Sequence, residues 1–576
     1  MKRLWFLVMM VVAVHAAEAL VAPAGGGELS VNASLTAYVF PEHGKALKQE
    51  QGIQVEVIKE DPSKPYCAQI SFTCAGLHKL PAKTPLLAVV RARVVDGQEG
   101  NLIAKVQHGA NPYTAFSSST GFSVYAEWRE YPILLMTDQD VSSERLQVVL
   151  FCGQKKQKVE IASMRLLSYP VGTDVSNFPR IRRSYVGREA DAPWRKEALD
   201  RIEKIRKGDF RQVIRDAAGS PIANQEVTIE LKRHAFGFGS AIRVSSMVDP
   251  SGDGEQVRKI VDDLFSMVVL ENDLKDFEWA PEKTAEQKQK RNQRMEQTMA
   301  WLSERDIALR GHYLMQTATP QNLHGKSADE VRKHYLESAR ERLDFVGDRV
   351  IEWDVINHPV AWSGADLLTK HPGLERIDRE VFSLAMEKTK LPMFINEDQI
   401  FRPGRQQDET YDYIVGLQAE KFPVAGLGNQ AHFDESFLPS PQEMLDVTDR
   451  FAKIVPTQVI TEFDITTTAD EQLAADFTRD TMIACFSHPG YHGFILWGFW
   501  EGIHWKPEAA SWNKDWSIRK RGEVLRDLIQ KEWHTKVTIK TDAEGYATWR
   551  GFPGVYTVQS GNTTLPKLRV SLEKNR

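Results

Sequence analysis

The sequence has few cysteines, little net charge and no recognisable cofactor motif. Its 576 residues include four cysteines, whose spacing matches no zinc site. The formal net charge of −5 at pH 7 gives no sign of a nucleic-acid partner. We find neither a phosphate-binding loop nor a His-Glu-x-x-His motif, and we therefore expect no cofactor and no metal.

Long apolar runs are also scarce, and the most apolar stretch lies at the N-terminus. Lys2 and Arg3 precede the run Leu4–Val14, and small residues follow at Ala16 and Ala19. The run is well short of the ~20 residues needed to cross a bilayer. We therefore predict a cleaved signal peptide at residues 1–19, a secreted or periplasmic protein and no membrane span.

Residues 28–170 consist of short alternating apolar runs separated by turn residues, a pattern typical of a β-sandwich. The runs resemble the jelly-roll carbohydrate-binding modules attached to polysaccharide hydrolases. Two interpretations remain open for Tyr113, Phe116, Tyr125 and Trp128, which are either a sugar-stacking platform or part of the core. In an oxidising compartment the cysteines allow one local bridge, and buried thiols are the alternative. The candidate bridges are Cys67–Cys74 and Cys74–Cys152, and Cys485 is far away in the sequence.

Residues 171–193 contain glycine, proline and scattered charge, which predicts a linker. A helix and a small β unit are expected over residues 194–233, and a further β unit over residues 534–576. We expect these flanking pieces to pair into one small β domain.

Residues 234–533 contain eight short apolar segments at regular intervals, each followed by a stretch long enough for a helix. The segments are Ala235–Ile242, Leu264–Leu270, Ala308–Leu314, Val350–Ile356, Met393–Glu397, Val424–Gln430, Val459–Ile465 and Gly493–Phe499. This alternation predicts an α/β fold, a (β/α)8 TIM barrel. The seventh segment carries Glu462 and Asp464, which point to the same side of a strand. Carboxylates at the C-terminal end of a barrel strand are where this fold places its chemistry.

Motifs along the barrel resemble those of glycoside hydrolase family 10, the endo-β-1,4-xylanases, in its extended plant and bacterial form. They are Phe236–Gly239, Glu271-Asn272, Arg310-Gly311-His312, Trp353–Asn357, Asn396, Gly426–His432, Ile460–Asp464 and Trp497-Gly498 with Trp505. The resemblance implies retaining hydrolysis by two carboxylic acids about 5–5.5 Å apart. It makes Glu462 the nucleophile, supported by His432 and Asp464. It places Glu271, Asn272, Lys275, His312, Asn357, Gln430, Trp497 and Trp505 against the sugar.

The sequence departs from the family where the general acid/base should be. A glutamate ordinarily follows the asparagine of the fourth strand, and this chain has His358 there. Proton donation to the leaving oxygen typically contributes ~10²–10⁴-fold to the rate. The third and fifth strands also differ, with Gln316-Thr317 and Asn396-Glu397-Asp398. We hypothesise that Glu397 or His358 supplies the missing proton.

Three functions follow from these patterns. The first is a monomeric, secreted glycoside hydrolase with an altered acid/base, acting on a xylan-like polysaccharide or oligosaccharide. The second is a catalytically impaired polysaccharide-binding protein, which the replacement by His358 favours. The third is a metal enzyme that uses His312, His358 and His432, a use that the sugar-site motifs make unnecessary.

Overall fold

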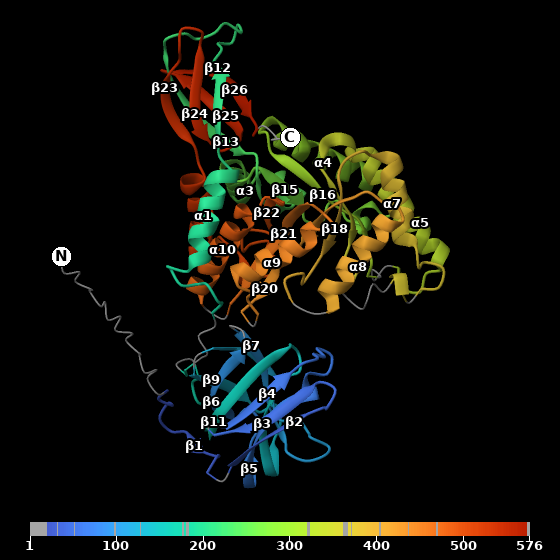
Figure 1. The fold of residues 1–576 in the computed structure, drawn as a ribbon. Helices are drawn as coiled ribbons and strands as arrows, with labels where there is room; N and C mark the ends of the chain where they lie inside the picture. Colours follow the sequence, from blue (N-terminus) through green and yellow to red (C-terminus); the bar gives the residue numbers. More distant parts are fainter. Residues whose placement is uncertain are drawn as a thin grey trace, which may run out of the picture. The chain divides into compact units, whose positions relative to one another are not determined.

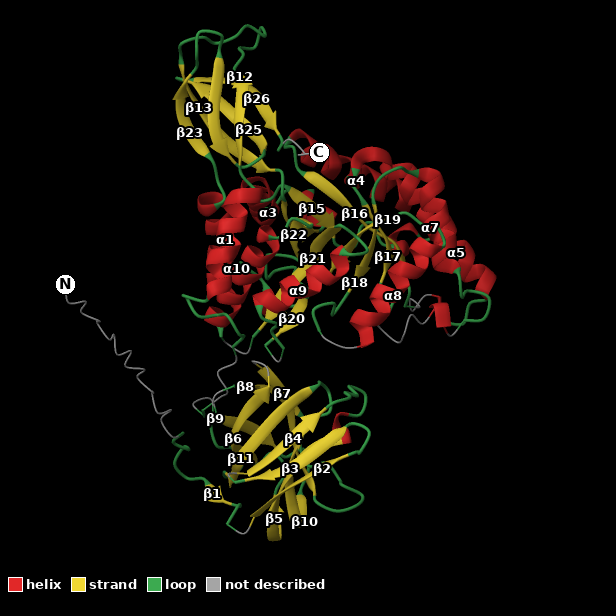
Figure 2. Cartoon of the chain, in the orientation of Figure 1, coloured by secondary structure: helices red, strands yellow, loops and turns green. Residues whose placement is uncertain are grey.

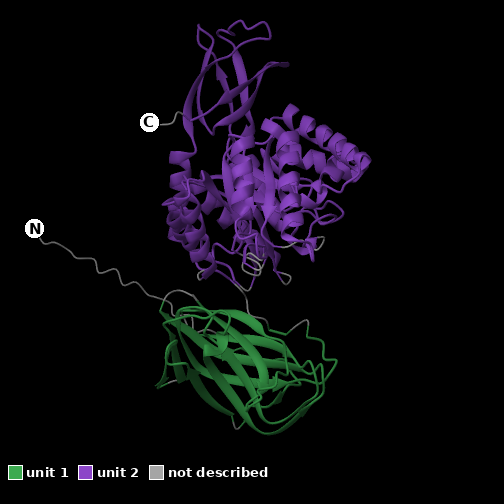
Figure 3. Ribbon diagram, turned by 90° about the vertical axis from the view of Figure 1, so that its right-hand side faces the viewer, with its two compact units in different colours: residues 1–183 green, residues 184–576 purple. Residues whose placement is uncertain are grey.

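The computed structural model describes residues 20–572, except 32, 51, 97–98, 127, 176–177, 180–183, 319–322, 361–366, 370, 403–404, 436 and 468–469. The chain forms two compact units, residues 1–183 and 184–576 (Figure 3). The predicted signal peptide, residues 1–19, lies outside the described residues. None of the helices in the described ranges combines the length and apolar composition needed to cross a bilayer. The boundary between the two units, after residue 183, falls inside the predicted linker of residues 171–193. The part of the linker after it belongs to the second unit, where the buried Tyr185 donates a hydrogen bond to Asp480.

The first unit is a sandwich of two antiparallel sheets, ordered β3-β4-β11-β6-β9, with β1 beside β11, and β2-β5-β10-β7-β8. Its strands are β1 (Gly27–Glu28), β2 (Ala33–Val39), β3 (Gly44–Gln49), β4 (Gly52–Val57), β5 (Ala68–Leu80), β6 (Pro85–Asp96), β7 (Glu99–His108), β8 (Thr120–Tyr125), β9 (Arg129–Met136), β10 (Val141–Phe151) and β11 (Gln157–Ser168). Alternate side chains of both sheets point inward and form one apolar core.

The four candidate platform aromatics of the sandwich do not share one surface. Phe116 lies in the core, and Tyr125 packs against it. Trp128 lies under the guanidinium groups of two arginines, and Tyr113 is 54% exposed. All four cysteines of the chain are buried free thiols, so neither candidate bridge is formed in this structure.

The second unit contains a closed barrel of eight parallel strands, which confirms the predicted fold class. In order around the barrel they are β14 (Gly237–Ile242), β15 (Met267–Leu270), β16 (Ala308–Gln316), β17 (Trp353–Asn357), β18 (Met393–Glu397), β19 (Val424–Asn429), β21 (Thr457–Thr466) and β22 (Tyr491–Leu496). Pairing of β19 with β21 and of β22 with β14 closes the ring. The short β20 (His432–Asp434) pairs in parallel with the end of β21, and sequence analysis did not predict it.

Helices surround the barrel strands (Figure 2). They are α1 (Pro193–Ile205), α2 (Val244–Met247), α3 (Gly252–Leu264), α4 (Ala285–Glu304), α5 (Ala328–Val346), α7 (Ile377–Lys388), α8 (Arg405–Ala419), α9 (Pro441–Ala452), α10 (Glu471–Ser487) and α11 (Lys520–Asp527). Capping boxes fix where α4, α5 and α9 begin, at Thr284, Ser327 and Ser440. The helices and barrel strands share one apolar core.

The segments before and after the barrel pair with each other, as expected (Figure 1). One sheet has the order β23-β13-β25-β26, and β12 pairs with β24. These strands are β12 (Gly208–Val213), β13 (Glu226–His234), β23 (Lys536–Lys540), β24 (Tyr546–Gly551), β25 (Gly554–Ser560) and β26 (Thr563–Val570). His234 ends β13 just before the first barrel strand, and its ring contacts Phe238, Phe486 and Phe552. The small β unit therefore packs on the barrel through aromatic side chains.

Glycine is required where neighbouring barrel strands approach closely. A Cβ at Gly239 would lie 2.3 Å from the carbonyl oxygen of Met267, a backbone atom that has no room to move. We expect Gly239→Ala to lower the free energy of unfolding of the barrel by about 1–3 kcal/mol, measured by urea denaturation. Gly416→Ala is the matched control. It lies in α8 with no atom within 4 Å of the added methyl group, and it should be neutral or slightly stabilising. Equal losses in both variants would contradict this account.

Candidate active site

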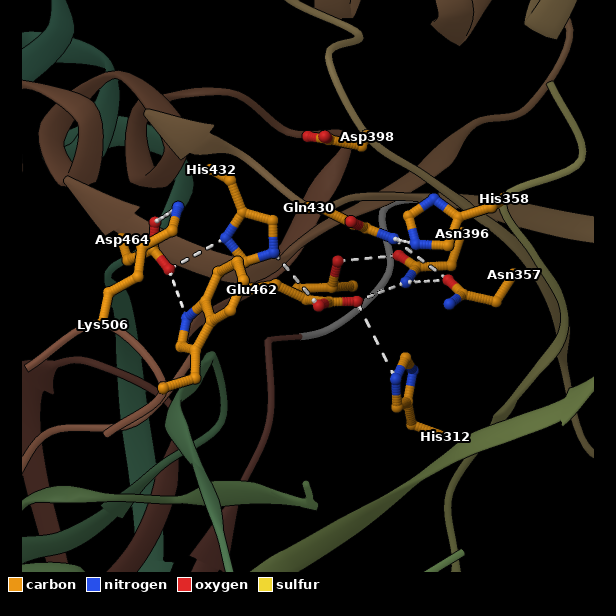
Figure 4. Close-up of polar contacts among 12 residues, drawn as sticks. His312, Asn357, His358, Asn396, Asp398, Gln430, His432, Glu462, Asp464 and Lys506 are labelled. Atoms are coloured by element: carbon orange, nitrogen blue, oxygen red, sulfur yellow. Dashed lines mark hydrogen bonds and ion pairs between the residues drawn. The ribbon is translucent and has the colours of Figure 1, made fainter. Parts of the chain in front are cut away.

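Polar side chains from adjacent strands converge at the C-terminal end of the barrel (Figure 4). Asn357 ends β17, Asn396 and Glu397 end β18, and Gln430 follows β19. Glu462 lies on β21, and His432 begins β20 beside it. Because parallel strands end at the same edge, residues far apart in the sequence form one buried polar cluster.

Glu462 is the centre of this cluster and is only 5% exposed. The Nδ2 of Asn396 donates to its Oε1 at 2.7 Å, and the Nε2 of His432 lies 3.3 Å from its Oε2. The Nε2 of His312 is 3.9 Å from Oε1. Each carboxylate oxygen therefore has a donor on the protein side, which fixes the direction of the carboxylate.

The surrounding donors keep Glu462 ionised although it is buried. Burial alone raises the pKa of this carboxyl, but the hydrogen bond to His432 and the nearby imidazoles outweigh it and lower the pKa to about 2. Burial lowers the pKa of His432, but Asp464 and Glu462 outweigh that effect and raise it to about 10. At neutral pH the site therefore holds a carboxylate paired with an imidazolium.

Asp464 holds His432 from the other side. Its Oδ2 lies 2.9 Å from the Nδ1 of His432 and also accepts a 2.8 Å hydrogen bond from the indole of Trp505. Lys506 lies 3.4 Å from Oδ1. These contacts set the ring orientation of His432, so that its Nε2 faces Glu462. Trp505, which is 46% exposed, has its ring 4.9 Å from that of His432 and forms one side of the site.

A chain of amide contacts joins Glu462 to His358. The Oδ1 of Asn357 accepts from Asn396 at 2.9 Å and from Gln430 at 3.0 Å. The same Gln430 nitrogen lies 3.2 Å from the Nε2 of His358. His358 therefore lies in the same hydrogen-bonded cluster as Glu462.

Glu397 is fully buried, with an exposed fraction of 0%. Its Oε1 lies 3.5 Å from the Nδ1 of His358 and accepts the N–H of Asp398 at 2.8 Å. Its Oε2 accepts the N–H of Val360, also at 2.8 Å. Asp398 is less buried than Glu397, and burial raises the pKa of its carboxyl.

Four of the residues expected to contact the sugar follow β15 and β22. Glu271, Asn272 and Lys275 lie in the loop after β15, and Trp497 directly follows β22. Glu271 forms a two-bonded ion pair with Arg243, with a shortest distance of 2.6 Å. The carbonyl of Asn272 accepts the N–H of Lys275 at 2.9 Å. The Nζ of Lys275 lies 5.5 Å from the ring centre of the buried Trp497, and burial lowers the pKa of this lysine. Arg243 neutralises Glu271, a pairing that the sequence analysis missed.

A buried ion-pair network lies beneath the site inside the barrel. Arg310 pairs with both Glu352 and Asp354. His492 contacts Glu352 at 2.9 Å, and the Nδ1 of His312 contacts Asp354 at 2.9 Å. The network ends at the His312 ring, whose Nε2 faces Glu462. Among the described residues, no cluster of His, Cys, Asp or Glu has the arrangement to hold a metal ion.

The pairing of His432 with Asp464 gives a titration prediction. Asp464→Asn removes the negative charge that raises the pKa of His432, so the titration midpoint should fall from about 10 by roughly 1–3 units, measured by NMR of the imidazole. Because the raised pKa belongs to the folded state, His432 contributes stability that is fully present below its ordinary pKa of about 6.5 and is lost as pH rises through about 10, whereas the lowered pKa of Asp464 contributes stability that is lost as pH falls. An unchanged midpoint in the variant would show that Asp464 does not hold His432.

Comparisons with known proteins show what the chain is similar to. The family model for glycosyl hydrolase family 10 matches residues 229–520. Anti-sigma-I factor RsgI6 of Acetivibrio thermocellus is 27% identical over 391 residues, which are 66% of this chain and 49% of that protein. Endo-1,4-beta-xylanase 1 of Arabidopsis thaliana is 23% identical over 374 residues, 64% of this chain and 38% of that protein. This chain therefore spans half or less of the length of these two relatives.

Among solved structures, xylanase 10B of Thermotoga petrophila in complex with xylobiose is similar, with a TM-score of 0.46 and 19% identity. The match covers 52% of this chain and 95% of that one. The family match spans just over half of the 576 residues and includes the barrel strands that carry the buried carboxylate site. The chain therefore belongs to glycosyl hydrolase family 10.

Proposed function

We propose that this protein is a glycoside hydrolase that cleaves a β-1,4-linked plant-type polysaccharide such as xylan, with retention of configuration. Glu462 is the nucleophile, and a non-standard group supplies the proton. The observation that carries this proposal is the carboxylate of Glu462, which is buried, ionised and held in one direction by Asn396 and His432. A carboxylate held in this way suits attack on a sugar C1.

The surroundings of Glu462 support a sugar ligand. Trp505 offers a partly exposed apolar ring, and Asn357 and Gln430 offer forked polar groups, which is the combination that sugar recognition requires. Several relatives carry the name endo-1,4-beta-xylanase, which supports xylan as the substrate class. The N-terminal leader motif supports export, and the strand pattern of the sandwich supports a carbohydrate-binding role for that unit.

A second candidate function is polysaccharide binding without efficient cleavage. His358 at the family's acid/base position favours it, because a missing carboxylic acid would slow hydrolysis of ordinary glycosides. One relative is named as an anti-sigma factor rather than as an enzyme. In this alternative the C-terminal end of the barrel holds a glycan chain and releases it unchanged.

Product analysis with xylohexaose separates the two functions. We expect the wild-type protein to release shorter xylo-oligosaccharides whose new ends form with the β configuration, followed by NMR in the first minutes. Glu462→Gln should abolish release, because the amide cannot form the glycosyl ester. Glu409→Gln, a surface substitution on α8, is the matched control and should leave the rate unchanged. Binding of xylohexaose without any cleavage would support the second function, and initial formation of the α anomer would contradict a retaining mechanism.

A further inference from the structure

The two sheets of the first unit have different outward faces. On the sheet that contains β6 and β11 the outward face is apolar, and Tyr169 and Phe178, which follow β11, pack on Leu87, Val89 and Leu167. On the sheet ordered β2-β5-β10-β7-β8, alternate residues pack in the core and the residues between them face outward. This second outward face is mainly polar, so a different kind of contact is expected there.

Strand pairing arranges the outward side chains of β2, β5, β10 and β7 in three rows. The rows are Tyr38, Gln69, Phe151 and Ile103; Thr36, Ser71, Val149 and Lys105; and Ser34, Thr73, Gln147 and Gln107. Lys105 is the one charged residue in these rows, every position of which the structure describes. The face is therefore nearly neutral and rich in hydroxyl and amide groups.

A hydrogen-bonded ladder of side chains crosses this face. The Nε2 of Gln107 donates to the Oε1 of Gln147 at 2.9 Å, and the Nε2 of Gln147 donates to the hydroxyl of Thr73 at 3.0 Å. Both glutamines are buried although they lie outside the core, and Val149 in the neighbouring row is fully buried. Neighbouring side chains therefore shield the middle of the face, and the ladder holds the amide groups in fixed directions.

Aromatic rings gather at one end of the face. Tyr38 is 57% exposed, and its ring centre lies 5.6 Å from that of Phe40, which in turn lies 6.3 Å from that of Tyr66. Tyr66 is 45% exposed, and Phe151 lies in the same row as Tyr38. Exposed aromatic rings beside fixed amide groups can stack on the apolar face of a sugar ring and bind its hydroxyl groups.

The charge and polarity of the face favour a glycan over other macromolecules. A nucleic acid or an anionic membrane requires a cluster of Lys and Arg, whereas Lys105 is the one cation in the three described rows. The centre of a protein interface is apolar and depleted in serine, whereas Ser, Thr and Gln side chains dominate the middle of this face. A neutral chain rich in hydroxyl groups matches this surface best.

We propose that the outward face of β2, β5, β10 and β7 binds a neutral β-1,4-linked glycan chain such as xylan. Tyr38 and Tyr66 stack on sugar rings, and Gln147 and Gln107 bind sugar hydroxyl groups. Adjacent strands are about 4.8 Å apart, so four strands span about 14 Å, which accommodates an oligosaccharide rather than a single sugar. Because the ligand is taken to be the polysaccharide that the barrel cleaves, the choice of xylan rests on the proposed function.

Titration calorimetry of the full chain tests this site. Glu462→Gln serves as the background, so that the barrel does not consume the ligand, and xylohexaose is the probe. We expect two binding events per chain, one of which Tyr38→Ala and Tyr66→Ala each weaken by roughly tenfold or more. Both tyrosines are exposed, so their removal should leave the unfolding temperature unchanged.

Val95→Ala is the matched control for the tyrosine variants. Val95 is 40% exposed on β6 of the other sheet, and its removal should leave both binding events unchanged. Hydrogen exchange locates the site independently, because xylohexaose should slow amide exchange in β2, β5 and β10, and Tyr38→Ala should abolish that protection. Protection confined to the barrel, with binding by Tyr38→Ala equal to that of the background, would show that the proposal is wrong.

Failure of this site can be distinguished from failure of the hydrolase proposal. Trp505→Ala removes a ring from the barrel site and should weaken the binding event that Tyr38→Ala leaves intact. A single event that responds to Trp505→Ala alone would overturn the sandwich site while the hydrolase proposal stands. A Tyr38-dependent event in a protein that cleaves no xylohexaose would support the sandwich site while the hydrolase proposal fails.

A second copy of the chain is the alternative occupant of this face. Sedimentation of the wild-type chain should show no association that depends on Tyr38. If xylohexaose does not bind and Tyr38→Ala dissociates a dimer, the face is an interface between two copies and the proposal is wrong.

Discussion

The site depends on the ion pair between the Glu462 carboxylate and the His432 imidazolium inside the barrel. A buried charge without a partner is costly, and here each member of the pair has a second partner. Asp464 holds His432 at 2.9 Å, and Asn396 donates to Glu462 at 2.7 Å. These contacts come from three strands, so closure of the barrel is what assembles the nucleophile. The short strand β20 positions His432, because its pairing with β21 places His432 opposite Asp464.

A second group of buried, paired charges lies below the site. Arg310 lies between Glu352 and Asp354, and histidines contact both ends of this group. The guanidinium of Arg310 pairs with both carboxylates, which compensates for the loss of hydration in the interior. Through His312 the network reaches Glu462, so the barrel interior and the active site are electrostatically connected. At the edge of the cluster, the backbone N–H groups of Asp398 and Val360 donate to the two carboxylate oxygens of Glu397.

The fold could be predicted from sequence because its signals are local. The eight strands begin and end within a few residues of the apolar segments, and the alternation with helices indicates the barrel directly. Side-chain pairing across strands was harder to predict. Asn396 was recognised as part of a motif, but its bond to Glu462 depends on the relative register of β18 and β21. The pair of Arg243 with Glu271 and the burial of Phe116 have the same cause, because long-range contacts leave no periodic signal in the chain.

The role of Glu462 is tested most directly by trapping the covalent intermediate. The protein would be incubated with a 2-deoxy-2-fluoro-xylobioside that carries a dinitrophenolate leaving group, and its mass and peptides then measured. Fluorine slows the second step more than the activated first step, so the glycosyl ester accumulates. The account predicts one added disaccharide per chain on the peptide that contains Glu462. Release of dinitrophenolate without an adduct, or an adduct on another residue, would contradict it.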